Sequence, residues 1–317
     1  MRKTIFLLLV FALLSIQALA QSAKRVAITP QSYNGWKDAL IISNGSVEAV
    51  IVPSIGRVMQ FRFVGEDGVF WENPAVAGKP VNPAAKEWVN FGGDKPWPAP
   101  QSDWPKITPR AWPPPIGFDS SAWEAKIGND SVDLISPVDP HYGIRAIRRI
   151  KLDPARPTMT ITTVFEKVKG EPRNVAVWII TQLKDPDLIL VPMPKDSIFA
   201  EGFNKQSKEL PEYFKVQNGT IAIKRDPKKS TKIGTDATTL TWIGAKHALR
   251  IEASRVPNVV YPDNGSSAEV YTNFDPLKYV ELEMLGPLKE MKIGDKQEQI
   301  NRYTLMPRSR IRNLKDF

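Results

Sequence analysis

Two glutamates near the C-terminal end of the sequence have the spacing of an acid and base pair. Glu281 and Glu283 lie in the segment Tyr279–Leu285, whose other members are mostly apolar. In a strand alternate side chains point to one face, so the two carboxylates would share a side, roughly 7 Å apart. If that side lines a cleft, repulsion and partial burial would raise one pKa into the range used for proton transfer. If it faces water, the pair is only the polar half of an amphipathic strand.

The sequence has two histidines, His141 and His247. His141 lies in Asp-Pro-His-Tyr-Gly at the start of an expected strand, where it would serve as a general acid or base or simply be a surface group. His247 follows Gly-Ala-Lys at an expected hairpin tip and is predicted to be structural or incidental. So few histidines exclude a His-x-x-x-His zinc helix, and there is no cysteine to supply a thiolate ligand. We therefore predict neither a metal nor a cofactor.

The region 88–123 contains five tryptophans and eight prolines and has neither helical nor strand periodicity. Proline lacks an N–H and breaks a β-ladder, so the region is predicted to be a long, stiff loop. Indole rings are flat and amphipathic, and they stack on sugar rings or on other aromatic groups. Two interpretations remain open: the loop forms one wall of a ligand site, or its tryptophans cap the end of a β-sandwich.

If the loop is a wall of a site, the polar groups around it would fix the ligand by directional hydrogen bonds. The predicted ligand-binding residues are Arg57, Asn90, Asp94, Lys95, Trp97, Gln101, Trp104 and Trp112. The predicted catalytic residues, if the protein is an enzyme, are Glu283, Glu281 and His141.

The first twenty residues have the pattern of a secretory signal peptide, with Arg2 and Lys3 before an apolar run and Ala-Leu-Ala before Gln21. We expect a periplasmic or secreted protein with no transmembrane segment, because no second apolar run is long enough to span a bilayer. The formal charge of +9 falls to +7 without the signal peptide. Lysines and arginines are scattered, and the densest runs, 224–232 and 308–312, are predicted to be solvated faces or tails. Nucleic acid is not an expected partner outside the cytoplasm, and attraction to an anionic envelope surface or an acidic glycan stays open.

Short β-branched segments separated by Gly, Pro, Asn and Asp predict antiparallel sheets. The pair Asn44-Gly45 between two apolar runs predicts a hairpin. The segment 201–213 is the most tolerant of a helix, and 185–194 is predicted to be a connection. We predict an all-β protein with one domain over residues 21–317. The expected strands are 39–43, 46–53, 57–64, 69–71, 132–136, 142–152, 159–168, 175–182, 220–225, 239–243, 248–253, 268–272, 279–285 and 299–305.

Several runs resemble the galactose-mutarotase-like superfamily, and most closely an exported bacterial family within it. They are EAVIVPSIGRVMQF, NFGGDKPWPAPQ, WPPP and YVELEMLGPL. The resemblance implies a large antiparallel β-supersandwich and a sugar ligand. Ile55-Gly56-Arg57 is similar to an early Gly-Gly-Arg turn of aldose 1-epimerases, and Phe91-Gly92-Gly93 stands where they have His-Gly-Gly. Leu282-Glu283-Met284-Leu285 resembles the context of their catalytic base, which implies that role for Glu283.

One departure from the epimerases concerns the acid that protonates the ring oxygen. The family's histidine on a middle strand has no counterpart in Val177–Gln182, and His141 or Lys95 would have to replace it. The first hypothesis is therefore an exported carbohydrate-binding protein with its site under the Trp/Pro loop. The second is an aldose 1-epimerase or a related sugar-acting enzyme, and the third is a structural envelope protein that docks a partner through the loop.

Overall fold

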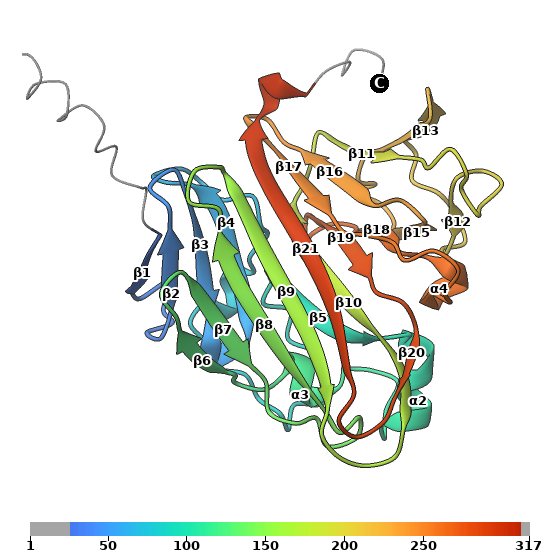
Figure 1. The fold of residues 1–317 in the computed structure, drawn as a ribbon. Helices are drawn as coiled ribbons and strands as arrows, with labels where there is room; N and C mark the ends of the chain where they lie inside the picture. The colour runs from blue at the N-terminus through green and yellow to red at the C-terminus, as the bar shows by residue number, and fades with distance from the viewer. Residues whose placement is uncertain (1–25, 312–317) are drawn as a thin grey trace, which may run out of the picture.

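The computed structural model describes residues 26–311, so the predicted signal peptide lies outside the described residues. The strand-forming segments build two large antiparallel sheets that pack face to face, which confirms the all-β prediction. Figure 1 shows β8, β9 and β21 of the second sheet lying in front of β5 and β10 of the first. None of the helices among residues 26–311 is long and apolar enough to cross a membrane.

The first sheet has the strands of residues 27–99 on one side and those of residues 204–285 on the other, with β10 between them. In spatial order its strands are β1 (Ala27–Pro30), β2 (Leu40–Ser43), β3 (Val47–Val52), β4 (Arg57–Phe63), β5 (Asp94–Ala99), β10 (Arg173–Lys184), β19 (Tyr279–Leu285), β18 (Ala268–Thr272), β15 (Thr231–Thr235) and β12 (Asn204–Lys205), and β20 (Lys289–Met291) pairs with one end of β10.

The second sheet has the long strand β21 near its middle. In order its strands are β13 (Phe214–Gln217), β14 (Thr220–Ile223), β11 (Leu188–Pro192), β16 (Thr239–Ile243), β17 (His247–Glu252), β21 (Lys296–Pro307), β9 (Thr158–Lys167), β8 (Ile144–Leu152), β7 (Ser131–Ile135) and β6 (Glu124–Ile127). The helices are single turns: η1 (Pro53–Ile55), η2 (Pro74–Val76), η3 (Gln101–Asp103), α2 (Trp104–Ile107), α3 (Ile116–Asp119), α4 (Pro262–Gly265) and η4 (Arg308–Arg310).

The core lies between the sheets because alternate residues of each strand are apolar and point inward. On β19, Val280, Leu282 and Met284 belong to this core and are at most 1% exposed. The hairpin predicted at Asn44-Gly45 is confirmed, since it joins β2 to β3 and Gly45 takes a positive φ of 80°.

The strand β5 overturns part of the loop prediction. Residues 94–99 contain Pro96 and Pro98, yet they pair with β10 over the whole strand. On the other side β4 is in register with β5 only at Val58 and Asp94, so the strand is an edge beyond that point and tolerates proline there. The carbonyl of Pro98 accepts a bond from the Trp104 indole instead of joining a ladder.

Glycines in the preceding turn let β5 approach the sheet closely. Gly92 and Gly93 take φ values of 91° and 73°, and a Cβ on Gly92 would lie 2.2 Å from the carbonyl oxygen of Trp71. The Gly93 N–H donates to that same oxygen at 2.9 Å. A side chain at position 92 would therefore displace the start of β5.

Three further expectations from the sequence are wrong. The segment 201–213 contains no helix and contributes the short strand β12. The predicted connection 185–194 contains β11, which pairs with both β14 and β16. The predicted strand 69–71 is reduced to a single bridge between Phe70 and Leu183.

Candidate functional site

The outward face of the first sheet, opposite the core, gathers the charged residues of five strands. Strand register places Lys95 beside Ile180 and Ile180 beside Glu283, so β5, β10 and β19 contribute to one row. The next row joins Gln182, Glu281 and Tyr271. Because residues paired across antiparallel strands share a face, Glu281 and Glu283 point to the same side, as their spacing predicted.

Five tryptophans pack together over one end of this face, and we call Trp88, Trp97, Trp104, Trp112 and Trp178 the tryptophan cluster. The ring of Trp97 is at its centre, with centroids 5.5–5.9 Å from the other four. Trp97 and Trp104 are 4% and 0% exposed, whereas Trp112 is 43% exposed. The loop thus closes down on the sheet, and Trp112 is the member of the cluster that is exposed to solvent.

A buried ion pair fixes the loop in this position. Arg57 on β4 donates to Asp119 of α3, with Nη2 and Oδ1 2.7 Å apart, and both side chains are at most 2% exposed. The indoles of Trp88 and Trp97 donate to the two oxygens of the same carboxylate at 3.0 and 2.9 Å. Arg57 was predicted to contact a ligand, and the structure gives it the position of an anchor between the loop and the sheet.

Lys95 and Glu281 form the centre of the face. The ammonium of Lys95 lies 3.9 Å from Oε1 of Glu281 and 5.1 Å from the centroid of the Trp97 ring. Lys95 is 1% exposed and its Nζ has no hydrogen-bond partner among the described residues. Burial lowers the pKa of Lys95 to about 8, although Glu281 opposes the shift. Glu281 is the more accessible partner, and its Oε1 also accepts from Gln182 at 2.9 Å.

Glu283 lies deeper and is held from two sides. Its Oε2 accepts from the Trp178 indole at 2.6 Å and from Lys232 at 2.9 Å. Lys232 also contacts Glu269 at 2.7 Å. Burial raises the pKa of Glu283, Glu269 and Glu281 add to the rise, and Lys232 opposes it. Burial alone would lower the pKa of Lys232, but its two carboxylate partners raise it.

Sequence reasoning missed Lys232, Glu269 and Trp178. Lys232 ends the basic run that was predicted to be solvated, yet its side chain is only 23% exposed and lies between two carboxylates. No local signal distinguishes it, because its partners lie 37 and 51 residues further along the chain. Trp178 was part of an expected strand, and only the pairing of β10 with β19 shows which carboxylate it meets.

Aromatic side chains also border the face at its other end. The ring of Trp71 lies against Tyr279 with centroids 4.7 Å apart, and Tyr271 is 6.3 Å from Tyr279. Tyr279 is on the same strand face as Glu281, and Tyr271 pairs with Glu281 across β18 and β19. Glu281 and Lys95 are therefore flanked by aromatic rings at both ends.

Two of the predicted ligand contacts are in positions that exclude direct contact with a ligand on this face. Asp94 points into the core between the sheets, where it pairs with Arg148 and accepts from Thr181 and Tyr303 at 2.7 and 2.6 Å. Trp104 has no exposed surface. Asp94 is adjacent to Lys95 in sequence, and the alternation of the strand sends the two side chains to opposite faces.

The remaining predicted residues lie away from the Lys95 and Glu281 pair. His141 lines a separate cavity of about 270 Å³ together with Pro113, Pro114 and Arg110 of the loop. Gln101 is exposed in η3. Asn90 is 7% exposed and accepts from the N–H of Gly92, so it shapes the turn before β5.

No family model matches the sequence, and no curated protein is similar to it. Solved structures are similar over most of the chain. A proposed mutarotase from Salmonella typhimurium shares 12% identity with a TM-score of 0.56, covering 94% of this chain and 100% of its own. A proposed aldose 1-epimerase from Escherichia coli K12 shares 12% identity with a TM-score of 0.55, covering 89% and 99%. A galactose mutarotase-like protein from Lactobacillus casei shares 7% identity with a TM-score of 0.54, covering 84% and 100%.

Proposed function

We propose that this chain, which has the galactose mutarotase-like fold, is an exported protein that binds carbohydrate on the outward face of its first sheet. The observation that carries the proposal is the pair Lys95 and Glu281. Its buried ammonium has no acceptor, and a carboxylate oxygen lies 3.9 Å away. A sugar hydroxyl is both donor and acceptor, so one hydroxyl can accept from Lys95 while it donates to Glu281.

The aromatic borders of the face support the same ligand class. Trp71 and Tyr279 lie at one end and the exposed Trp112 at the other. Flat rings beside a few directional polar groups are the usual composition of a site that must hold a sugar by stacking and by hydrogen bonds. Export is supported by the signal-peptide pattern at the start of the sequence.

Titration of tryptophan fluorescence with a panel of mono- and oligosaccharides tests the proposal. We expect saturable quenching by at least one sugar, because the tryptophan cluster borders the site. Lys95→Met and Glu281→Gln should each weaken binding by about tenfold or more, since a hydrogen bond to a charged group contributes roughly 1.5–3 kcal/mol.

Glu298→Gln is the matched control, because Glu298 is exposed on β21 of the second sheet and its side chain forms no hydrogen bond or ion pair with the described residues. Its affinity should equal that of the unmodified protein. If no sugar changes the fluorescence, or if Lys95→Met and Glu281→Gln bind as tightly as Glu298→Gln, the proposed site is wrong.

A second candidate function is an aldose 1-epimerase, and the pKa of about 8 at Lys95 favours it. Mutarotation needs a base that takes the proton of the anomeric hydroxyl while the ring C–O bond breaks, and an acid that protonates the ring oxygen. Glu281, whose side chain is 11% exposed, would take the first role, and Lys95, with a pKa of about 8, would supply the proton for the second. In this form the hypothesis uses Lys95 and Glu281 in place of Glu283 and His141, because Oε2 of Glu283 already accepts from Trp178 and Lys232 and His141 lines a separate cavity.

Polarimetry on freshly dissolved hexoses separates the two candidates. An epimerase accelerates the change of rotation, and Lys95→Met or Glu281→Gln should lower the rate by about 10²–10⁴-fold, the usual contribution of a general acid or base. A binding protein leaves the spontaneous rate unchanged for a sugar that quenches its fluorescence.

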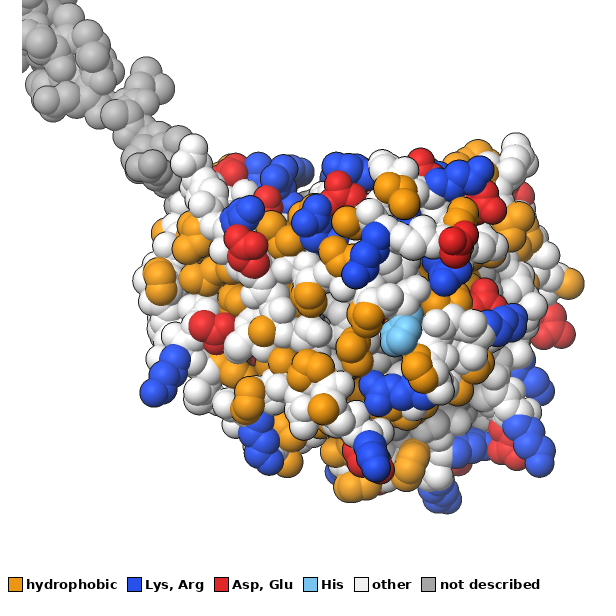
Figure 2. Space-filling view, turned by 90° about the horizontal axis from the view of Figure 1, so that it is seen from below, with side chains coloured by type: hydrophobic (Ala, Val, Ile, Leu, Met, Phe, Trp, Pro, Cys, Tyr) orange, Lys and Arg blue, Asp and Glu red, His pale blue; other side chains and the backbone are white. Residues whose placement is uncertain are grey.

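The docking hypothesis finds less support in the loop itself. A docking surface usually needs a contiguous exposed apolar patch. Within the tryptophan cluster only Trp112 is exposed by more than a third. Figure 2 shows that hydrophobic side chains on the underside, where α2 and α3 lie in Figure 1, are spread among polar and charged ones.

A further inference from the structure

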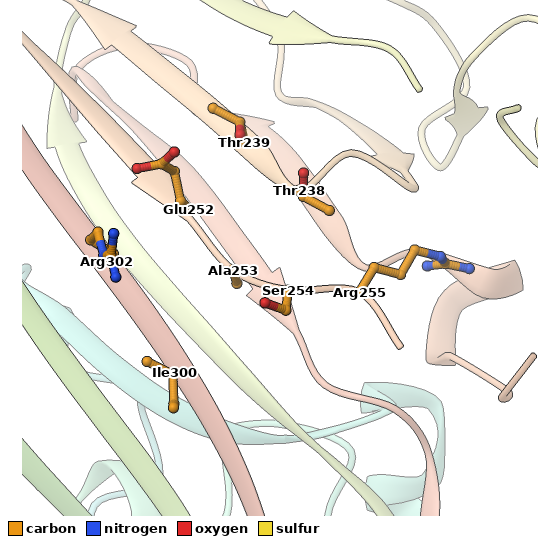
Figure 3. A pocket seen from close by; sticks show the side chains of 8 residues that line it. All are labelled: Thr238, Thr239, Glu252, Ala253, Ser254, Arg255, Ile300 and Arg302. Carbon is orange, nitrogen blue, oxygen red and sulfur yellow. The ribbon is translucent and has the colours of Figure 1, made fainter. Parts of the chain in front are cut away.

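The outward face of the second sheet carries two adjoining hollows that share Glu252 and Arg302. One has a volume of about 630 Å³ and the other about 510 Å³. Figure 3 shows the first, with Glu252 and Arg302 on the neighbouring strands β17 and β21 and Arg255 to one side. Together the hollows form a trough across this sheet, and we call it the cationic trough.

The trough is rich in positive charge. Its charged side chains are Lys151, Arg156, Arg250, Arg255, Arg302, Asp153 and Glu252. Five are basic and two are acidic, which gives a net charge of +3. Lys151 and Arg156 pair with Asp130 and Asp153, so the basic side chains that remain for a ligand are Arg250, Arg255 and Arg302.

Arg302 lies in the shared part of the trough, opposite Glu252 across β17 and β21, without forming an ion pair with it. It is exposed and has no ion pair or side-chain hydrogen bond among residues 26–311. The acid shared by the two hollows, Glu252, is 3.9 Å from Arg250, a distance that gives a weak contact at an exposed site. Arg302 and Arg250 are therefore free to pair with an anionic ligand.

The other lining groups indicate what kind of anion fits. The polar uncharged side chains are hydroxyls, namely Thr158, Thr160, Thr238, Thr239, Ser254 and Thr304. Hydroxyls and guanidinium groups are the partners that sugar hydroxyls and carboxylates or sulfates use. The lining has no aromatic side chain on which a nucleic acid base would stack, and Ile300 is its one exposed large hydrophobic residue, which is too little to enter a membrane.

We propose that the cationic trough is a second binding site, which takes a segment of an acidic polysaccharide bearing carboxylate or sulfate groups. The two hollows lie side by side, so consecutive residues of one polymer chain occupy both. Arg302 and Arg250 bind the acidic groups, and the threonine hydroxyls bind the ring hydroxyls. The site is on the opposite sheet from Lys95 and Glu281, so it neither requires nor excludes sugar binding there.

Surface plasmon resonance on immobilised polygalacturonate and heparin, with neutral dextran as reference, tests the proposal. We expect binding to at least one acidic polymer and none to dextran. The double variant Arg250→Gln/Arg302→Gln should weaken binding by about tenfold or more, since it removes two charge-assisted contacts. The variant Arg302→Lys should retain most of the affinity because it keeps the charge.

The control is Lys37→Gln/Lys79→Gln, which also removes two positive charges, but from exposed positions outside the trough. It should leave the affinity unchanged, and thermal unfolding should show that both double variants fold. An equal loss in both double variants would show attraction by overall charge and overturn the proposal. Preferential binding of duplex DNA or of phosphatidylglycerol vesicles, lost on Arg250→Gln/Arg302→Gln, would also overturn it by assigning the trough to another class of ligand.

Discussion

Charged side chains are buried on the outward face of the first sheet and exposed on the outward face of the second. On the first sheet Lys95, Glu283 and Glu269 are at most 1% exposed, under tryptophans and neighbouring segments. On the second sheet Arg149, Arg250 and Arg302 lie in water on strands of similar alternation. Burying charge costs free energy unless it is paired, whereas exposed charge costs little and contributes little. The covered face is therefore where a charged group without a partner indicates a function.

The inner side of the first sheet also buries charge, and a substitution there should cause the largest loss of stability. Asp94 pairs with Arg148 in the core, and neither side chain is exposed. Asp94→Ala would leave the Arg148 guanidinium buried without its carboxylate. We expect a loss of about 3–5 kcal/mol in the free energy of unfolding, measured by urea denaturation. A loss below about 1 kcal/mol would show that this pair is as weak as an exposed one and would break the comparison.

Two variants within the tryptophan cluster compare the stability contributed by a buried ring with that contributed by an exposed one. Trp104→Ala removes a ring with no exposed surface and should lower the free energy of unfolding by about 3–5 kcal/mol. Trp112 is 43% exposed, so Trp112→Ala should cost clearly less, about 1 kcal/mol, while it changes the fluorescence response to sugar. Equal losses for the two variants in urea denaturation would mean that the loop is only a cap, with no open ring for a ligand.

The strands that build the two faces could be predicted from the sequence, but the contacts between them could not. Strands β16, β18 and β19 have the predicted bounds because β-branched and aromatic residues alternate there between clear turn signals. β5 was missed because its prolines are tolerated only where β4 no longer lies beside it. This is a property of the assembled sheet. Lys232 was placed in solvent because the carboxylates that surround it come from other strands.

The candidate site was predicted in part for the same reason. The shared face of Glu281 and Glu283 follows from strand geometry alone. Which of them is accessible depends on Trp178 and Lys232, and these are brought to Glu283 by long-range pairing. His141 was considered because of its chemistry, and the fold places it in a cavity walled by the loop's prolines. The role of Glu281 stays a prediction, which the variant Glu281→Gln tests.

The lowered pKa of Lys95 predicts that the free energy of unfolding depends on pH. Burial lowers this pKa from 10.5 to about 8, so between these values the unfolded chain binds more protons at this site than the folded chain. The free energy of unfolding contributed by Lys95 therefore rises as the pH increases from about 8 to about 10.5. The difference between the unmodified protein and Lys95→Met should shift by about 3 kcal/mol in favour of the unmodified protein between pH 7 and pH 11.

Urea denaturation of both proteins at the two pH values measures this shift. Lys37→Met is the control, because Lys37 is exposed, and its difference from the unmodified protein should not change with pH. If the difference for Lys95→Met is also independent of pH, Lys95 titrates like an exposed lysine. The outward face of the first sheet would then not perturb its charged groups more than that of the second.

The smallest expected effect is on the open face. Arg149 and Asp133 pair across β7 and β8 at 2.7 Å, and the arginine side chain is 58% exposed. Solvent screens this pair, so Asp133→Ala should change the free energy of unfolding by less than about 1 kcal/mol, and the change should shrink further in 1 M salt. Urea denaturation at low and high salt gives both numbers. A loss as large as that of Asp94→Ala, unaffected by salt, would mean that ion pairs on this sheet contribute to stability whether or not they are covered, and burial would no longer explain the difference between the two faces.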